Sequence, residues 1–257
     1  MKTVKTLGLP SGLRDVDEIL SGFQKSDLIV LAARPSMAKT SFCLNMVANT
    51  AVKHKEPVLF FSLEMSSTQL AINILCSEAG VETDKVIRKI VSSKDEINLS
   101  NARTQISDSP IFIDETPGIS ISEISSKARD AAFKHGLSMV IVDYLQLMDD
   151  DTSSNCQGLK ALARELNIPV IAVSQLSRSV ETKSDKRPLL SDFRNPEAIE
   201  PSADVVMFLY RDEYYYKEKS EAKGLAELIV AKNRNGSVDT VTLAFSEEHR
   251  RFSDYDI

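Results

Sequence analysis

Short apolar runs alternate with longer amphipathic stretches along most of the chain. The runs are rich in Val, Ile, Leu and Phe, which is typical of strands buried on both faces of a parallel sheet. We expect strands at residues 28–32, 58–62, 111–114, 139–143, 170–174 and 205–210. Because the stretches between them are long enough for crossover helices, the pattern predicts an α/β fold: a doubly wound, mostly parallel sheet flanked by helices.

Helix starts and a hairpin can also be located. A serine followed three residues later by Gln or Glu has the spacing of a capping box, which marks a helix N-terminus. This spacing occurs at Ser66 and Gln69, Ser93 and Glu96, and Ser120 and Glu123. After Ala226 two alternating runs flank Asn235-Gly236, a hairpin turn signal. We therefore expect antiparallel strands at the C-terminal end of the sheet.

Composition narrows the class of protein. With 257 residues, 42% of them hydrophobic and 26% charged, the chain has the size and composition of one large folded domain. The apolar runs are too short to span a bilayer, so we expect no membrane partner and a cytoplasmic location. A net charge of −6 excludes a protein that coats nucleic acid by bulk electrostatics, although it leaves room for a local basic loop.

The cysteines do not form a metal motif. Cys43, Cys76 and Cys156 lack C-x-x-C spacing, and the three histidines are scattered through the sequence. We expect reduced thiols, two of them in the core, and no zinc site.

The stretch from Leu28 to Phe42 joins an apolar strand to a helix through a loop that ends in Lys39 and Thr40. Its spacing is that of the phosphate-binding pattern G-x-x-x-x-G-K-[ST], with Ala33 and Ala38 in the two glycine positions. Such a loop binds phosphate through backbone N–H groups, the lysine and a magnesium-bound hydroxyl. The alternative is an ordinary strand-turn-helix junction with a solvated lysine.

Polar residues follow the other predicted strands. Glu64 and Asp143 end two apolar runs, and Gln175 ends a third. Ligands of open α/β sheets collect at the carboxyl ends of the strands, so these side chains are candidates for magnesium binding, for activating water and for sensing a terminal phosphate. Each could instead simply cap its strand.

Seven segments, taken in order, resemble the C-terminal motor domain of the bacterial replicative DNA helicases of the DnaB family. They are LGLPSGLRDVDEILSGFQKSDLIVLAARPSMAKTSF, FFSLEMS, VIVDYLQL, LKALARELNIPVIAVSQLSRSVE, KRPLLSDFR, ADVVMFLYRDEYY and AKNRNG. The resemblance covers nearly the whole chain and implies a RecA-like ATPase core that uses ATP and Mg²⁺. By the same resemblance, residues 13–257 are the helicase motor domain and residues 1–12 the remnant of an N-terminal linker. A RecA-type recombinase or a circadian-clock-type ATPase fits these segments less well.

The resemblance also implies roles for individual residues. The phosphate loop corresponds to Ala33, Arg34, Pro35, Ser36, Met37, Ala38, Lys39, Thr40 and Ser41. Thr40 and Asp143 are the expected metal residues, Glu64 the catalytic glutamate and Gln175 the sensor. Lys232 and Arg234 resemble a basic pair that one subunit inserts into the ATP site of its neighbour.

Partners follow from the resemblance as well. The family works as a homohexameric ring on single-stranded DNA, with a helicase loader and primase as further partners. Arg194, Asn195 and Glu197 lie where the family has a loop that grips the DNA backbone. These features imply an ATP hydrolase and DNA helicase that translocates on single strands and unwinds duplex.

Three departures favour a second hypothesis. Ala38 stands where the family has glycine, which we expect to weaken ATP binding or turnover. Residues 149–157 look shorter than the family's connection, so its basic loop is missing, and the acidic residues 149–151 in this segment would repel a phosphate backbone. A degenerate relative without catalysis, acting as a regulatory or assembly partner, is therefore the alternative.

Overall fold

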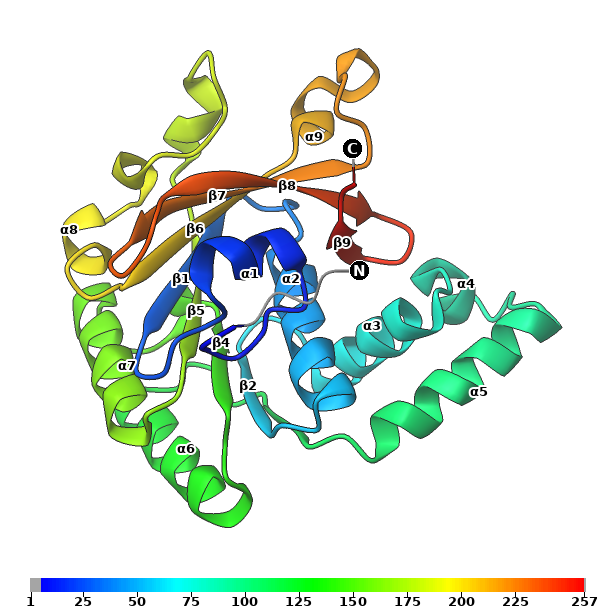
Figure 1. Ribbon diagram of the computed structural model, residues 1–257, viewed down its shortest axis with the longest axis horizontal. Helices are drawn as coiled ribbons and strands as arrows, with labels where there is room; N and C mark the ends of the chain where they lie inside the picture. Colours follow the sequence, from blue (N-terminus) through cyan, green and yellow to red (C-terminus); the bar gives the residue numbers. More distant parts are fainter. Residues whose placement is uncertain (1–5, 257) are drawn as a thin grey trace.

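A nine-stranded sheet runs through the middle of the protein (Figure 1), whose computed structural model describes residues 6–256. The strand order is β3-β2-β4-β5-β1-β6-β7-β8-β9. The first six strands of this order are parallel, and β7, β8 and β9 are added antiparallel. The strands are β1 (Leu28–Ala33), β2 (Val58–Ser62), β3 (Ile111–Asp114), β4 (Met139–Asp143), β5 (Val170–Gln175), β6 (Val205–Tyr210), β7 (Leu225–Asn233), β8 (Asp239–Ser246) and β9 (Arg251–Asp254).

The predicted fold class is confirmed. All six predicted parallel strands are present, and β1 and β5 each extend one residue beyond the predicted end. The hairpin around Asn235-Gly236 is the β7–β8 connection. The short final strand β9, which pairs with β8, was not predicted because its four residues carry no clear apolar alternation.

Helices cover both faces of the sheet (Figure 1). Side chains of α1, α2 and α3 join one core cluster with one face of β1, and α6 and α7 join the other cluster with the opposite face. The helices are α1 (Arg14–Leu20), α2 (Lys39–Val47), α3 (Ser67–Ala79), α4 (Thr83–Ile87), α5 (Ser93–Ser107), α6 (Ile121–His135), α7 (Thr152–Leu166), α8 (Pro196–Ile199) and α9 (Asp212–Tyr216). A π-helical turn, Ala48–Lys53, continues α2.

Capping boxes start three of these helices. The predicted boxes at Ser66 and Ser120 are present. The box predicted at Ser93 is wrong by one residue, because Ser92 is the cap and Asp95 its partner. Ser92 and Ser93 are consecutive serines, of which Ser92 precedes α5 and Ser93 is its first residue, and Asp95 at the third helical position accepts the cap's backbone N–H as a glutamate would.

The buried thiols differ from expectation. We expected two cysteines in the core, whereas Cys43, Cys76 and Cys156 are all fully buried. Burial raises the pKa of each thiol, because a thiolate would lose its hydration there. These groups therefore behave as small apolar side chains.

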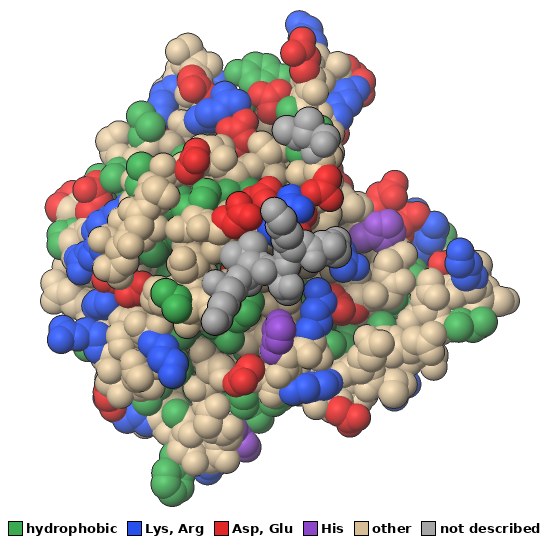
Figure 2. Space-filling view, in the orientation of Figure 1, with side chains coloured by type: hydrophobic (Ala, Val, Ile, Leu, Met, Phe, Trp, Pro, Cys, Tyr) green, Lys and Arg blue, Asp and Glu red, His purple; other side chains and the backbone are tan. Residues whose placement is uncertain are grey.

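The surface carries both signs of charge. Basic and acidic side chains of the described residues are interspersed over the face in Figure 2. Among residues 6–256, no helix combines the length and the apolar character that crossing a membrane requires.

Candidate functional site

A cavity of about 350 Å³ lies at the carboxyl ends of β1, β2, β4 and β5. Six residues of the predicted phosphate loop line it, namely Pro35, Ser36, Ala38, Lys39, Thr40 and Ser41. Glu64, Asp143 and Gln175 line it as well. The structure thus brings together residues that are far apart in sequence, because parallel strands end at the same edge of the sheet.

At Ala38, the second glycine position of the phosphate-binding pattern, the loop backbone keeps the conformation that glycine would adopt. Ala38 has φ 66° and ψ 33°, in the left-handed region that glycine adopts freely, and it directly precedes α2. An L-residue in this conformation costs roughly 1 to 2 kcal/mol. Ala33 lies in β1, outside the left-handed region, and pairs with Gln175 of β5. The substitution at Ala38 is therefore strained, and the one at Ala33 is not.

Lys39 points into the loop that precedes it. Its ammonium group donates to the carbonyl oxygens of Ala33, at 3.3 Å, and Arg34, at 3.2 Å. Burial lowers the pKa of Lys39, and the nearby carboxylates of Asp143 and Glu64 partly oppose this effect. The strand-turn-helix alternative with a solvated lysine does not describe this arrangement.

Thr40 and Asp143 are in direct contact. The Thr40 hydroxyl donates to Asp143 Oδ2 over 2.7 Å. Asp143 is 4% exposed, and its pKa is raised because burial disfavours the charged form, while the Thr40 hydrogen bond opposes this. The first turn of α2 and the end of β4 therefore place two side-chain oxygen atoms side by side.

Glu64 and Gln175 are placed by strand register. Ser62 at the end of β2 pairs with Asp143, and Leu63 N–H donates to the Asp143 carbonyl at 2.8 Å, which brings the exposed Glu64 carboxylate to the cavity. Gln175 is held by a residue we did not single out. The Gln146 amide accepts from Gln175 N–H at 3.1 Å and donates to Ser174 Oγ at 2.9 Å.

Three predicted loop residues do not bring their side chains to the cavity. Ala33 is buried in β1, and Met37 is 1% exposed and packs in the core. The Arg34 guanidinium pairs with Glu181 at 2.8 Å and donates to the Leu176 carbonyl. Only the backbone of these residues can contribute to a ligand.

Arg250, Tyr144 and Met65 also line the cavity and were missed. Tyr144 directly follows Asp143, so its position could have been inferred from the strand end. Arg250 comes from the turn between β8 and β9 and has φ 50°. Nothing in its local sequence indicates that this turn reaches the phosphate loop.

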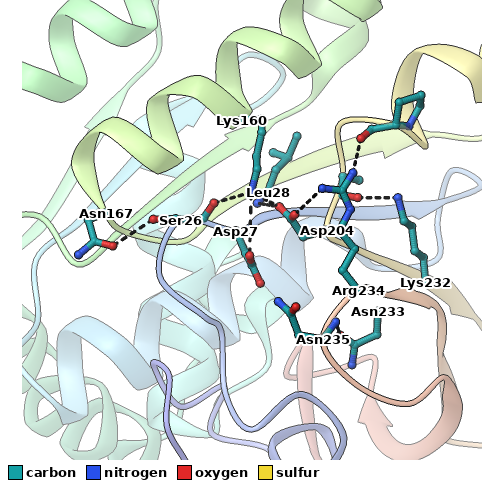
Figure 3. Close-up of polar contacts among 12 residues, drawn as sticks. Ser26, Asp27, Leu28, Lys160, Asn167, Asp204, Lys232, Asn233, Arg234 and Asn235 are labelled. Carbon is teal, nitrogen blue, oxygen red and sulfur yellow. Dashed lines mark hydrogen bonds and ion pairs between the residues drawn. The ribbon is translucent and has the colours of Figure 1, made fainter.

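Lys232 and Arg234 lie at the amino ends of the parallel strands, next to the start of β6 (Figure 3). The cavity lies at the opposite, carboxyl ends of these strands. Arg234 Nη1 donates to Asp204 Oδ1 at 3.2 Å and its Nη2 to the Pro201 carbonyl. Lys232 donates to the carbonyls of Glu200 and, at 2.7 Å, Ala203. Within one chain the basic pair and the phosphate loop are not brought together.

The predicted DNA-facing residues border a second cavity, of about 380 Å³. Arg194 and Asn195 line it with Asp150 and Asp151, and Glu197 lies in the first turn of α8. The acidic residues also have structural roles, since Asp151 caps α7 and Asp150 accepts from Ile121 N–H at 3.0 Å. Hydrogen bonds from Ser154 lower the pKa of Asp151, so its carboxylate stays charged.

Comparison with known proteins identifies the family. The family model of the DnaB-like helicase C terminal domain matches residues 8–254. The chain belongs to this family.

Relatives of this DnaB-like domain include curated replicative DNA helicases. It is 47% identical to the replicative DNA helicase DnaB of Geobacillus stearothermophilus over 255 residues, which cover 95% of the chain and 56% of the relative. Replicative DNA helicase DnaC of Bacillus subtilis (strain 168) is 46% identical, with the same coverage. The DnaB-like domain thus spans about half the length of the curated relatives it matches.

Solved structures share the fold. A solved ATPase domain superposes on the DnaB-like domain with a TM-score of 0.93 and 38% identity, over 98% of the DnaB-like domain and 93% of that chain. A second solved structure, described as that of a DnaB-like replicative helicase and its interactions with primase, has the same TM-score and identity. The match covers 98% of this chain and 63% of that one.

The cavity of this DnaB-like domain fits a magnesium-bound triphosphate. Among the described residues no group of three or more His, Cys, Asp or Glu side chains could hold a metal ion by itself. Mg²⁺ does not need one, because it typically takes one or two protein oxygens and completes its shell with phosphate and water. Thr40 Oγ1 and Asp143 Oδ2 supply such oxygens beside the N-terminus of α2.

Proposed function

We propose that the chain is the ATP-hydrolysing motor domain, residues 13–257, of a replicative DNA helicase, with residues 1–12 as the remnant of an N-terminal linker. Residues 1–5 of that linker lie outside the described part of the chain. The observation that carries the proposal is the meeting of Lys39, Thr40, Glu64 and Asp143 around one cavity. The family and the helicase relatives support the same function.

In this proposal MgATP supplies the phosphoanhydride bond whose hydrolysis drives movement. The loop N–H groups and Lys39 bind phosphate, and Thr40 and Asp143 hold the metal. Glu64 is exposed to the cavity and can orient and deprotonate the attacking water. Gln175 lies at the end of β5, where it can sense the terminal phosphate.

Arg234 and Lys232 complete the site of a neighbouring subunit. Transfer of a phosphoryl group develops negative charge, which an arginine supplied in trans stabilises. The basic pair lies at the amino ends of the parallel strands and the cavity at their carboxyl ends, so the pair cannot serve the cavity of its own chain. This placement supports the assignment. A homohexameric ring in the cytoplasm is the assembly we propose.

Single-stranded DNA is the proposed track, with Arg194 and Asn195 as contacts to the phosphate backbone and Glu197 beside them. Backbone contacts are independent of sequence and weaken with salt. Primase is a proposed partner because the similar helicase was solved with its primase interactions in view, and a helicase loader is proposed with it.

The test is ATP hydrolysis with and without single-stranded DNA. Glu64→Gln should keep ATP binding and lose turnover by about a hundredfold or more, because a general base contributes 10²- to 10⁴-fold. Glu96→Gln, on the exposed face of α5, is the matched control and should match the wild type.

The same assay decides between the two hypotheses. A wild-type protein that binds and hydrolyses no ATP would support the degenerate, non-catalytic relative. Geometry favours the motor, because Ala38 keeps the backbone conformation of the glycine it replaces.

A further inference from the structure

Asp204 is a buried carboxylate on which three elements converge (Figure 3). It is 4% exposed and lies between α8 and β6. Its Oδ2 accepts from Leu28 N–H at 2.8 Å and from Lys160 Nζ at 2.5 Å, and its Oδ1 accepts from Arg234 Nη1 at 3.2 Å. One side chain therefore ties the start of β1, the helix α7 and the end of β7 to each other.

The backbone of Asp204 repeats two of these ties. Asp204 N–H donates to the Leu28 carbonyl at 2.9 Å, and Arg234 N–H donates to the Asp204 carbonyl at 2.9 Å. Main-chain and side-chain bonds together fix Arg234 at two points. Because Leu28 begins β1 and the phosphate loop follows the other end of that strand, Asp204 also fixes the separation between Arg234 and the loop of the same chain.

The negative charge of Asp204 helps to fix the orientation of the Arg234 guanidinium. The other contact of the Arg234 guanidinium is a neutral acceptor, the Pro201 carbonyl. The Arg234 side chain remains 44% exposed, so part of the guanidinium stays accessible to a second chain. A charge-assisted hydrogen bond is about twice as strong as a neutral one, and here it restricts a long, flexible side chain.

We propose that Asp204 is a positioning residue for catalysis in trans: it fixes the guanidinium of Arg234 in the direction that the ATP site of the neighbouring subunit requires. This inference rests on the proposed role of Arg234. An arginine held in place before the reaction stabilises developing charge without a further ordering cost, so loss of its anchor lowers kcat more than it changes ATP binding.

The experiment is a double-mutant cycle on ATP hydrolysis by the assembled protein. Asp204→Asn keeps the size of the side chain and an oxygen for Leu28 N–H, and it removes the charge. We expect kcat to fall about tenfold to a hundredfold, as misplacement of a reacting group does, with KM for ATP unchanged. The kcat of Arg234→Ala should fall by at least the same factor. The double variant should match Arg234→Ala, because the anchor acts only through the arginine.

Asp27→Asn is the matched control. Asp27 is also buried in this network and lies 4.0 Å from Lys160, but it makes no hydrogen bond to Arg234 among the contacts of the described residues. We expect its kcat to equal that of the wild type. A fall in kcat as large as that of Asp204→Asn would indicate a general structural effect and would overturn the inference.

Two other outcomes separate this inference from the proposed function. If Arg234→Ala loses turnover and Asp204→Asn does not, the positioning role is wrong and the motor function stands. If Arg234→Ala has wild-type turnover, the role of Arg234 fails and the inference fails with it. Should Asp204→Asn not fold, Asp204→Glu keeps the charge and shifts the carboxylate by one methylene, and wild-type kcat in that variant would contradict positioning.

Discussion

Thr40 donates a 2.7 Å hydrogen bond to Asp143, across 103 positions of sequence. Both residues were predicted to serve one magnesium ion, and the fold places their oxygen atoms side by side. The contact joins the first turn of α2 to the end of β4, and both residues line the cavity.

Two Thr40 variants should show that the hydroxyl, and not the methyl group, is needed for stability and turnover. Thr40→Ser keeps the donor and should retain activity. Thr40→Ala leaves the buried Asp143 carboxylate without this partner, which should destabilise the fold by about 1 to 3 kcal/mol. It should also lower magnesium-dependent ATP turnover by about a hundredfold, because a metal contributes several kcal/mol to such reactions. Equal turnover in the two variants would contradict the metal role of Thr40.

Ala38 and Ala33 should respond oppositely to glycine. Ala38→Gly relieves roughly 1 to 2 kcal/mol of left-handed strain but gives up about 0.5 to 1 kcal/mol of chain entropy, so a net gain between about 0 and 1.5 kcal/mol is expected. Ala33→Gly meets no such strain in β1 and should lose stability. Denaturant unfolding of both variants tests this difference, and a loss of stability in Ala38→Gly would refute it.

Gln146 should control the position of Gln175. A glutamate at position 146 cannot donate to Ser174 Oγ or to the Gln175 carbonyl, which the amide reaches at 2.9 and 3.3 Å. We expect Gln146→Glu to lose about 1 to 3 kcal/mol of stability and to lower DNA-stimulated ATP turnover. Gln157→Glu, at an exposed position of α7, is the control and should change neither quantity. Wild-type turnover in Gln146→Glu would show that Gln175 does not depend on this amide.

Asp27 should make stability depend on pH. Burial, and then repulsion from Asp204, raise its pKa from 3.8 to about 6. The folded state therefore holds this proton up to a higher pH than the unfolded state, so its contribution to stability falls as pH rises from about 4 to about 6. Asp27→Asn should be the more stable protein above pH 6, by at most roughly 3 kcal/mol, and should equal the wild type near pH 3.5. Urea unfolding of both proteins across this range measures the difference, and parallel stability curves would exclude the effect.

The sequence predicts the sheet well because its strands are buried on both faces. Runs such as residues 139–142 are apolar throughout and stand out from the amphipathic helices on either side. The ends of these strands also locate Glu64, Asp143 and Gln175, since all parallel strands finish at one edge. Local rules are enough for this part of the site.

Residues that reach the site from distant turns could not be predicted. Arg250 and Gln146 depend on how the β8–β9 turn and the segment after β4 pack, and this packing is set by tertiary contacts. The position of Ser92 rather than Ser93 as a cap is a choice between two serines that sequence alone leaves open. Arg34 was assigned to the phosphate loop by its position, but its side chain finds a partner in Glu181.

In the proposed arrangement, the opposite placement of the phosphate loop and Arg234 makes every active site depend on a contact between two chains. A two-fold dimer could complete its sites only if the loop and Arg234 lie in one self-complementary interface, where the arginine of each chain meets the loop of its partner. Head-to-tail contacts place the two on different interfaces of each chain, and repeating such a contact gives a closed ring or a helical filament. Each chain is then both donor and recipient, so ATP turnover per chain should rise with protein concentration until the assembly is complete.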